Sequence, residues 1–163
     1  MTALSRRKRG GYFSASDDGP RPVSVRVKRR VAFSDADPMA VLWHGRYAEY
    51  FEQANEELGR RCGLSYLDFM RDGLRAPVVQ FHVDYFASPR LGEEVTVIGR
   101  MFWNEGARIN IEYEIRKEDD ALAASGYTVQ MFVTDRGEVL VASPALIETC
   151  RERWANGEFA DMQ

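Results

Sequence analysis

The chain has 163 residues, the length of one domain that buries a sizeable core. Hydrophobic residues make up 45% and charged residues 29%, and the formal net charge is −3, so the composition is that of a soluble globular protein without a nucleic-acid-binding surface. No apolar run approaches the ~20 residues that span a bilayer. The N-terminal residues lack the apolar core of a secretory signal. We therefore expect a cytoplasmic protein without a membrane partner.

The cysteines and histidines give no sign of a metal centre or a disulfide framework. Cys62 and Cys150 are far apart and lack a partner motif. The two histidines, His44 and His82, lack the tight spacing of a zinc-binding pair. We therefore expect no metal and no cofactor.

The ends of the chain differ in composition from its middle. Residues 1–22 are rich in Ser, Gly, Pro and charge, without periodicity, and are expected to form a disordered basic arm. Its run Arg6–Arg9 lacks aromatic neighbours, so a solvated tail is favoured over a nucleic-acid or targeting segment. A single domain is expected over residues 23–155, followed by a C-terminal tail over 156–163.

The first half of this domain predicts one strand and two helices. Valines alternate in a strand expected over residues 23–33. Apolar residues recur at helical spacing over 45–62, with most charges on the other side, and Gly63 is a typical helix stop. A second, short helix is expected over 66–71.

The second half predicts strands joined by turns. Apolar and polar residues alternate over 79–85, 95–103, 107–116 and 122–133, and a terminal helix is expected over 144–154. One long helix against one curled antiparallel sheet is an α+β domain. Because such a sheet has open edges, a dimer that extends it is expected.

The segment from Val31 to Leu64 is the candidate active site. It runs from a strand through a polar loop with Asp35 and Asp37 to His44, where the long helix is about to begin. Unpaired N–H groups at a helix N-terminus favour negative charge. A site that stabilises an oxyanion needs such donors with an acid or base nearby.

The string Phe33–Glu52, FSDADPMAVLWHGRYAEYFE, resembles the signature of the 4-hydroxybenzoyl-CoA thioesterase branch of the hotdog-fold superfamily. Further similarity at Tyr85, Pro89, Leu91-Gly92 and the Gly137 turn extends the resemblance over about residues 24–150. It implies a curled antiparallel five-stranded sheet wrapped around one long helix. It also implies a homodimer, or a homotetramer built as a dimer of dimers, that hydrolyses an acyl thioester of coenzyme A.

The resemblance assigns roles to particular residues. Asp37 is implied as the catalytic carboxylate, acting either as nucleophile or as general base on water. The backbone amides around Gly45, Arg46 and Tyr47 would hold the carbonyl oxygen of the substrate. His44 would orient water or donate to the carbonyl oxygen or the leaving sulfur.

Each of these residues also has an ordinary structural interpretation. Asp35 is expected to be a loop or cap residue, and Asp37 before Pro38 also fits an Asx turn. Trp43, Tyr47 and Tyr50 are expected to pack in the core in preference to forming a substrate wall. Among the helix acids, Glu52 lies beside the apolar stripe, yet it is expected to be solvated like its neighbours.

The substrate and the reaction retain alternatives at this point. Arg90, Arg100, Arg108 and Arg116 are candidates to bind the phosphates of coenzyme A, although each also fits the solvated sheet face. An acyl-carrier-protein substrate, a 3-hydroxyacyl-thioester dehydratase with His44 as base, and a non-catalytic thioester-binding protein remain alternatives. Ala40 stands where many relatives have glycine.

Overall fold

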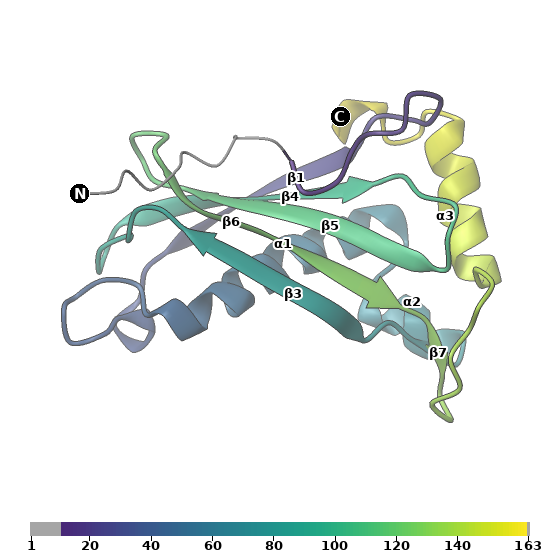
Figure 1. Cartoon of the computed structure of the whole chain (residues 1–163), viewed down its shortest axis with the longest axis horizontal. Helices are drawn as coiled ribbons and strands as arrows, with labels where there is room; N and C mark the ends of the chain where they lie inside the picture. The colour runs from purple at the N-terminus through teal and green to yellow at the C-terminus, as the bar shows by residue number, and fades with distance from the viewer. Residues whose placement is uncertain (1–10, 163) are drawn as a thin grey trace, which may run out of the picture.

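The main element of the fold is a five-stranded antiparallel sheet (Figure 1). The structure is a computed structural model that describes residues 11–162. Its strand order is β1-β4-β5-β6-β3. The strands are β1 (Val23–Arg30), β3 (Val78–Tyr85), β4 (Glu94–Phe102), β5 (Arg108–Arg116) and β6 (Leu122–Met131).

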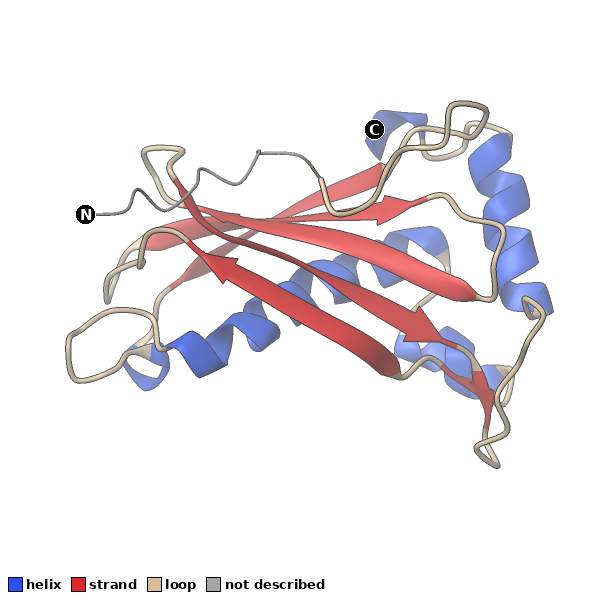
Figure 2. Cartoon of the chain, in the orientation of Figure 1, coloured by secondary structure: helices blue, strands red, loops and turns tan. Residues whose placement is uncertain are grey.

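Helix α1 (Tyr47–Cys62) runs along one face of this sheet, which curls around it, so the predicted α+β architecture is confirmed (Figure 2). The shorter elements lie at the ends of the sheet. They are α2 (Tyr66–Arg71), α3 (Ala145–Ala155), the β2–β7 pair (Leu74–Arg75 and Val133–Thr134), and the 3-10 turns η1 (Phe33–Asp35), η2 (His44–Arg46) and η3 (Ala160–Met162).

The order of the strands corrects one expectation. Strands β4, β5 and β6 follow one another through turns, as predicted, but β3 does not neighbour β4. Instead, β3 pairs with β6 at the far edge, so the segment 86–93 crosses to the opposite side of the sheet, where β4 pairs with β1. Alternation along a strand shows which face is apolar, but it leaves the choice of partner open.

Helix α1 lies directly on the sheet because two strand glycines face it. A Cβ at Gly126 would lie 2.2 Å from the backbone oxygen of His82 and 2.7 Å from the Phe51 ring. A Cβ at Gly99 would lie 3.0 Å from the Cβ of Ala54. The sheet therefore has its smallest residues where the helix approaches most closely, which is what a close-packed core requires.

The N-terminal segment is packed on the sheet over the residues that the structure describes. Residues 11–22 cross the face opposite α1, where the Tyr12 hydroxyl donates to Asp84 Oδ2 at 2.7 Å and lies 2.7 Å from Ser125 Oγ. Burial raises the pKa of Tyr12 to about 12. The expectation of a disordered arm over residues 1–22 therefore does not hold for residues 11–22. The Arg6–Arg9 run lies outside the described residues.

An aromatic contact explains why this segment is held. The Phe13 ring packs against those of Phe102 and Tyr127, with centroids 5.8 and 5.4 Å apart. The Phe13 amide donates to Glu112 Oε1, which is almost buried. The polar composition of the arm concealed this aromatic anchor, because two apolar residues form no period.

The C-terminal boundary also differs from the expected one. The tail expected after residue 155 contains Phe159 and Met162, and both are buried in the main core. The Phe159 ring lies 5.0 Å from the Arg153 guanidinium. These residues therefore belong to the domain.

Candidate functional site

Residues 35–43 form a small antiparallel hairpin at one end of the sheet. The Asp37 amide donates to the Val41 oxygen at 2.9 Å, and the Trp43 amide donates to the Asp35 oxygen at 2.9 Å. At its tip, Ala40 adopts a left-handed conformation with φ 59°. Glycine adopts this conformation without steric cost, so it would suit this position better than alanine does.

The Asp37 side chain is held by its own turn. Its Oδ1 accepts the Met39 amide at 2.8 Å and the Val41 amide at 3.4 Å, so the Asx turn predicted from sequence is present. The side chain is half-buried, and within residues 11–162 its Oδ2 has neither a hydrogen bond nor an ion pair. The turn thus orients the carboxylate and leaves one oxygen available.

Asp35 is buried beneath the hairpin, with 4% of its surface exposed. Its Oδ2 accepts the Tyr50 hydroxyl at 2.9 Å, Arg29 Nη2 at 3.2 Å and the Ala32 amide at 3.4 Å. Burial alone would raise the pKa of Asp35, but the Tyr50 hydrogen bond and the Arg29 charge outweigh it and lower the pKa. The expected cap residue is therefore an ionised carboxylate whose Oδ2 accepts three hydrogen bonds.

The turn η2 leads from the hairpin directly into α1. Neither η2 nor α1 has a capping side chain at its N-terminus. The Arg46 amide is engaged, since it donates to the Trp43 oxygen at 2.9 Å, which removes one of the expected oxyanion donors. The amides of His44 and Gly45 precede this first bonded N–H of the turn and so remain candidates.

Gly45 is required by a neighbouring side chain. A Cβ at this position would lie 2.5 Å from the Trp43 ring, which folds over the glycine. The space beside Gly45 is therefore filled by Trp43, a residue that is 45% exposed and whose ring lies 5.1 Å from that of His44. The His44 oxygen accepts the Tyr85 hydroxyl at 3.0 Å, which attaches the turn to β3.

The other two predicted contact residues face different surroundings. The Arg46 guanidinium is ion-paired with Glu49, so it is not free for a substrate without rearrangement. Tyr47 is buried, as its core interpretation predicts, and its ring meets that of Tyr85 edge to face at 4.8 Å. Burial raises the pKa of Tyr47 to about 12, so it is neutral at physiological pH.

A polar row on the inner face was missed in the sequence. Asn55 Nδ2 donates to Glu52 Oε1 at 3.0 Å, and Gln130 Nε2 donates to Asn55 Oδ1 at 3.4 Å. Glu52 therefore belongs to a chain of hydrogen bonds that reaches β6. Its signal in the sequence was the alternation of Gly126, Thr128 and Gln130, which shows that β6 turns its small and polar residues toward the helix.

The four arginines that are candidates to bind coenzyme A lie in different surroundings. Arg100 and Arg116 both bind Glu114, at 3.0 and 2.8 Å. Arg90 lies beside the hairpin, which it meets through the Val41–Arg90 bridge, and its guanidinium has no ion pair among the described residues. Arg90 is thus the candidate arginine whose backbone adjoins the hairpin that contains Asp37.

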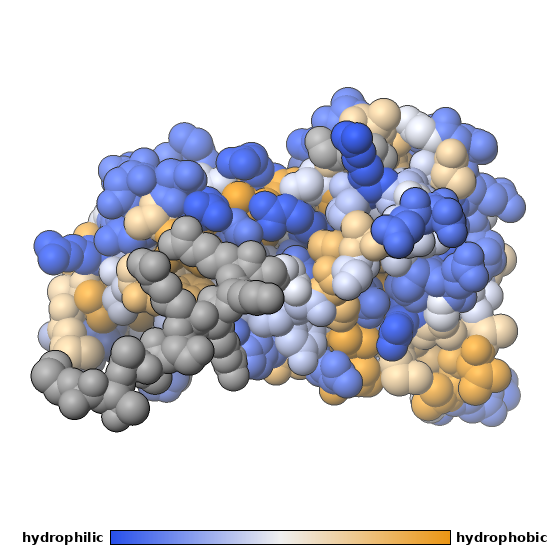
Figure 3. Space-filling view, turned by 45° about the horizontal axis from the view of Figure 1, so that its top comes forward, coloured by the Kyte–Doolittle hydropathy of each residue, from blue (hydrophilic) through white to orange (hydrophobic). Residues whose placement is uncertain are grey.

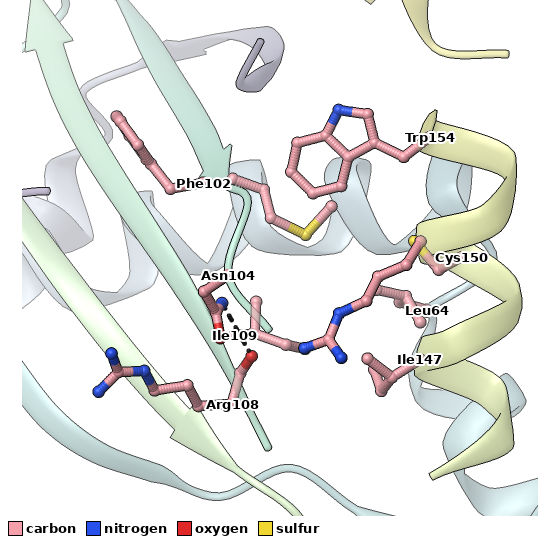
Figure 4. A pocket seen from close by; sticks show the side chains of 10 residues that line it. Leu64, Phe102, Asn104, Arg108, Ile109, Ile147, Cys150 and Trp154 are labelled. Atoms are coloured by element: carbon pink, nitrogen blue, oxygen red, sulfur yellow. Dashed lines mark hydrogen bonds between the residues drawn. The ribbon is translucent and has the colours of Figure 1, made fainter. Parts of the chain in front are cut away.

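The fourth arginine, Arg108, lines a cavity between α3 and the ends of β4 and β5 (Figure 4). Its volume is about 20 Å³, room for about one water molecule. None of the residues predicted to act on or hold the thioester lines this cavity, so it is no candidate for an acyl site. Within residues 11–162, no three His, Cys, Asp or Glu side chains converge as a metal site, and no helix is long and apolar enough to cross a membrane.

Comparisons with known proteins identify the family. A family model described as the thioesterase superfamily matches residues 39–124, more than half of the chain, and the match begins two residues after Asp37. A Synechocystis protein named as an esterase is 29% identical over 85 residues, which are 52% of this chain and 50% of that protein. The chain thus spans half the length of this relative.

Two further relatives match more of their own length. The acyl-CoA thioesterase YbgC of Haemophilus influenzae is 27% identical over 111 residues, 68% of this chain and 80% of that protein. The solved structure of DHNA-CoA thioesterase from Staphylococcus aureus superposes with a TM-score of 0.68 at 27% identity, covering 72% of this chain and 80% of that one. The chain therefore belongs to the thioesterase superfamily, a family of thioester hydrolases whose hotdog fold it shares.

Proposed function

We propose that this protein hydrolyses acyl-CoA thioesters, with Asp37 as the catalytic carboxylate. The observation that carries the proposal is the Asp37 turn, which orients the carboxylate through Oδ1 and leaves Oδ2 without a partner among the described residues. The uncapped turn η2 begins at His44, seven residues after Asp37 and directly after the hairpin. The relative YbgC is named as an acyl-CoA thioesterase, which supports the same reaction.

The proposed reaction converts an acyl-CoA and water into a carboxylic acid and free coenzyme A. Asp37 either takes a proton from the attacking water or attacks the carbonyl carbon itself, giving an anhydride that water then hydrolyses. The C–S bond breaks in either case, and the thiolate leaves with a proton. The carbonyl oxygen gains negative charge on attack, and the amides of His44 and Gly45 are the proposed donors to it. One such donor typically contributes about 3 kcal/mol to transition-state stabilisation.

Aromatic side chains are proposed to bind the acyl group. Trp43, Phe81 and Tyr85 are each about half exposed, at 45%, 49% and 53%. Phe81 and Tyr85 lie on the helix-facing side of β3, because their rings meet those of Phe51 and Tyr47. Exposed rings of this kind suit an aryl or medium-length acyl chain. No cofactor is needed, and Arg90 is the proposed contact for the coenzyme A phosphates.

A second copy of the chain is proposed to cover β3. Among residues 11–162 this strand pairs only with β6, so its other edge offers N–H and C=O groups that no described strand pairs. Apolar residues along and just after it are exposed, including Val78, Val79 and Phe86. Two such edges paired antiparallel would continue the sheet across a homodimer, and pairs of dimers would give a tetramer. Light scattering in solution gives the assembly directly, and a monomer would contradict this proposal.

The test of the function is thiol release from a panel of aryl- and alkyl-CoAs. Asp37→Asn should lower kcat at least about 100-fold on every substrate that the wild type hydrolyses. The matched control is Asp119→Asn, because Asp119 forms a similar turn by accepting the Ala121 amide at 3.1 Å. Full activity of Asp37→Asn would refute the assignment. Turnover of acyl-carrier-protein esters alone, formation of an enoyl product, or binding without turnover would each establish one of the alternatives.

A further inference from the structure

We infer that Asp35, together with Arg29 and Tyr50, is a positioning residue for the carboxylate of Asp37. This inference rests on the proposed function, since it concerns how the same site is held in place. None of the three side chains was assigned a role in the chemistry by its sequence pattern. Their place in the fold gives them one, because they join the hairpin to the two elements that flank it.

Three elements meet at the Asp35 carboxylate. Arg29 comes from the end of β1, Tyr50 from the first turn of α1, and Asp35 from the base of the hairpin. The Arg29 guanidinium lies over the Tyr50 ring, 3.9 Å from its centroid, and Tyr50 is fully buried. A cation over an aromatic face is favourable, and the two side-chain donors to the carboxylate come from two different elements. The hairpin is therefore bound to rigid elements on two sides.

The position of Asp35 determines that of the functional groups on the hairpin. Asp37 lies two residues after Asp35 in the first arm of the hairpin. Trp43, whose amide donates to the Asp35 oxygen, ends the second arm, one residue before His44. A shift at Asp35 is thus passed through the backbone both to the Asp37 carboxylate and to the amides that follow Trp43. A displacement of about 1 Å in a catalytic geometry can lower a rate by about 100-fold.

A purely stabilising role for this cluster predicts different behaviour. Buried ion pairs contribute little net stability, because desolvation offsets much of their attraction, although removing one partner is costly. If the cluster only stabilised the fold, a variant would have fewer folded molecules but an unchanged kcat for each of them. A positioning role requires that kcat falls in molecules that are fully folded.

The variants Asp35→Asn and Tyr50→Phe test this difference. Measured well below their melting temperatures, both should lower kcat at least about 10-fold while KM changes less than about 3-fold. The control for Asp35→Asn is Glu114→Gln, which removes the charge of a carboxylate bound to two arginines on the other face of the sheet. The control for Tyr50→Phe is Tyr113→Phe, which removes a buried hydroxyl 3.1 Å from Thr128.

Combining the changes separates an effect through Asp37 from an independent one. In the Asp37→Asn background, Asp35→Asn should lower kcat much less than it does in the wild type, because only its effect on the amides after Trp43 remains. Independent, additive losses would overturn the inference. So would an unchanged kcat in folded Asp35→Asn.

Amide hydrogen exchange tests the inference without any substrate. In Asp35→Asn, the bonded amides of Asp37 and Trp43 should exchange at least about 10-fold faster, whereas Glu114→Gln should leave them unchanged. Unchanged exchange at both amides would overturn the positioning role even if the wild type hydrolysed none of the substrates. Absence of turnover in the wild type, with faster exchange in the variant, would refute the proposed function and leave the positioning of the hairpin established.

Discussion

Replacing Ala40 with glycine should stabilise the protein, although Ala→Gly changes usually destabilise. Ala40 has φ 59°, at the tip of the hairpin that carries Asp37. A left-handed conformation costs an L-residue about 1–2 kcal/mol, and glycine avoids this cost. Glycine in turn loses about 0.5–1 kcal/mol through the greater entropy of its unfolded chain. The net expectation is a gain of about 0.5–1 kcal/mol.

The contacts of this residue do not oppose the gain. The Ala40 amide donates to the Asp37 oxygen, and the Ala40 oxygen accepts the Leu91 amide, both at 2.9 Å. These backbone bonds remain in Ala40→Gly, and the residue is exposed, so removing its methyl group leaves no cavity.

Thermal and urea unfolding measure the effect. For a domain of this size, a gain of about 1 kcal/mol raises Tm by about 2–4 °C. Ala48→Gly is the matched control, because Ala48 is exposed in helix α1, where the same change should cost up to about 1 kcal/mol. A loss of stability at both positions would refute the argument from backbone conformation.

Three further changes test the packing, the N-terminal segment and the buried charge. Gly126→Ala should destabilise by about 3 kcal/mol in urea unfolding, because its Cβ would meet the backbone oxygen of His82 at 2.2 Å. Tyr12→Phe should cost about 1 kcal/mol, since it leaves Asp84 without that hydroxyl donor, and it should speed proteolysis within residues 11–22. Asp35, whose pKa is lowered, contributes stability above about pH 4 that is lost as the pH falls further, so Asp35→Asn should flatten the acid limb of the stability profile below that pH.

The local patterns of the sequence were sufficient for most elements. The helical spacing over 45–62 corresponds to η2 and α1, and Gly63 adopts the left-handed conformation that ends the helix, with φ 75°. The short helix over residues 66–71 is confirmed to the residue. The strands agree with their expected ranges within one to three residues at each end, the largest difference being the first strand, which ends at Arg30 and not at Phe33. These elements depend on residues that are close together in the sequence, so the sequence alone is enough to predict them.

The candidate site likewise combines features that the sequence predicts with features that only the fold reveals. The sequence by itself located the loop of Asp37 and His44 before α1, because a polar loop at a helix start is a local pattern. It could not show that Arg29 and Tyr50 converge on Asp35, that Glu114 binds two of the candidate arginines, or that the Arg46 amide is already bonded.

The tertiary structure alone decided which distant segments meet. It placed β3 beside β6, brought Tyr12 onto the outer face of the sheet, and buried Phe159 in the core. Each of these contacts joins residues that are far apart in the chain, where no local period relates one to the other. The choice between alternative partners depends on the shape and burial of the whole domain, because every strand edge and apolar ring can pair with more than one surface until the others are occupied.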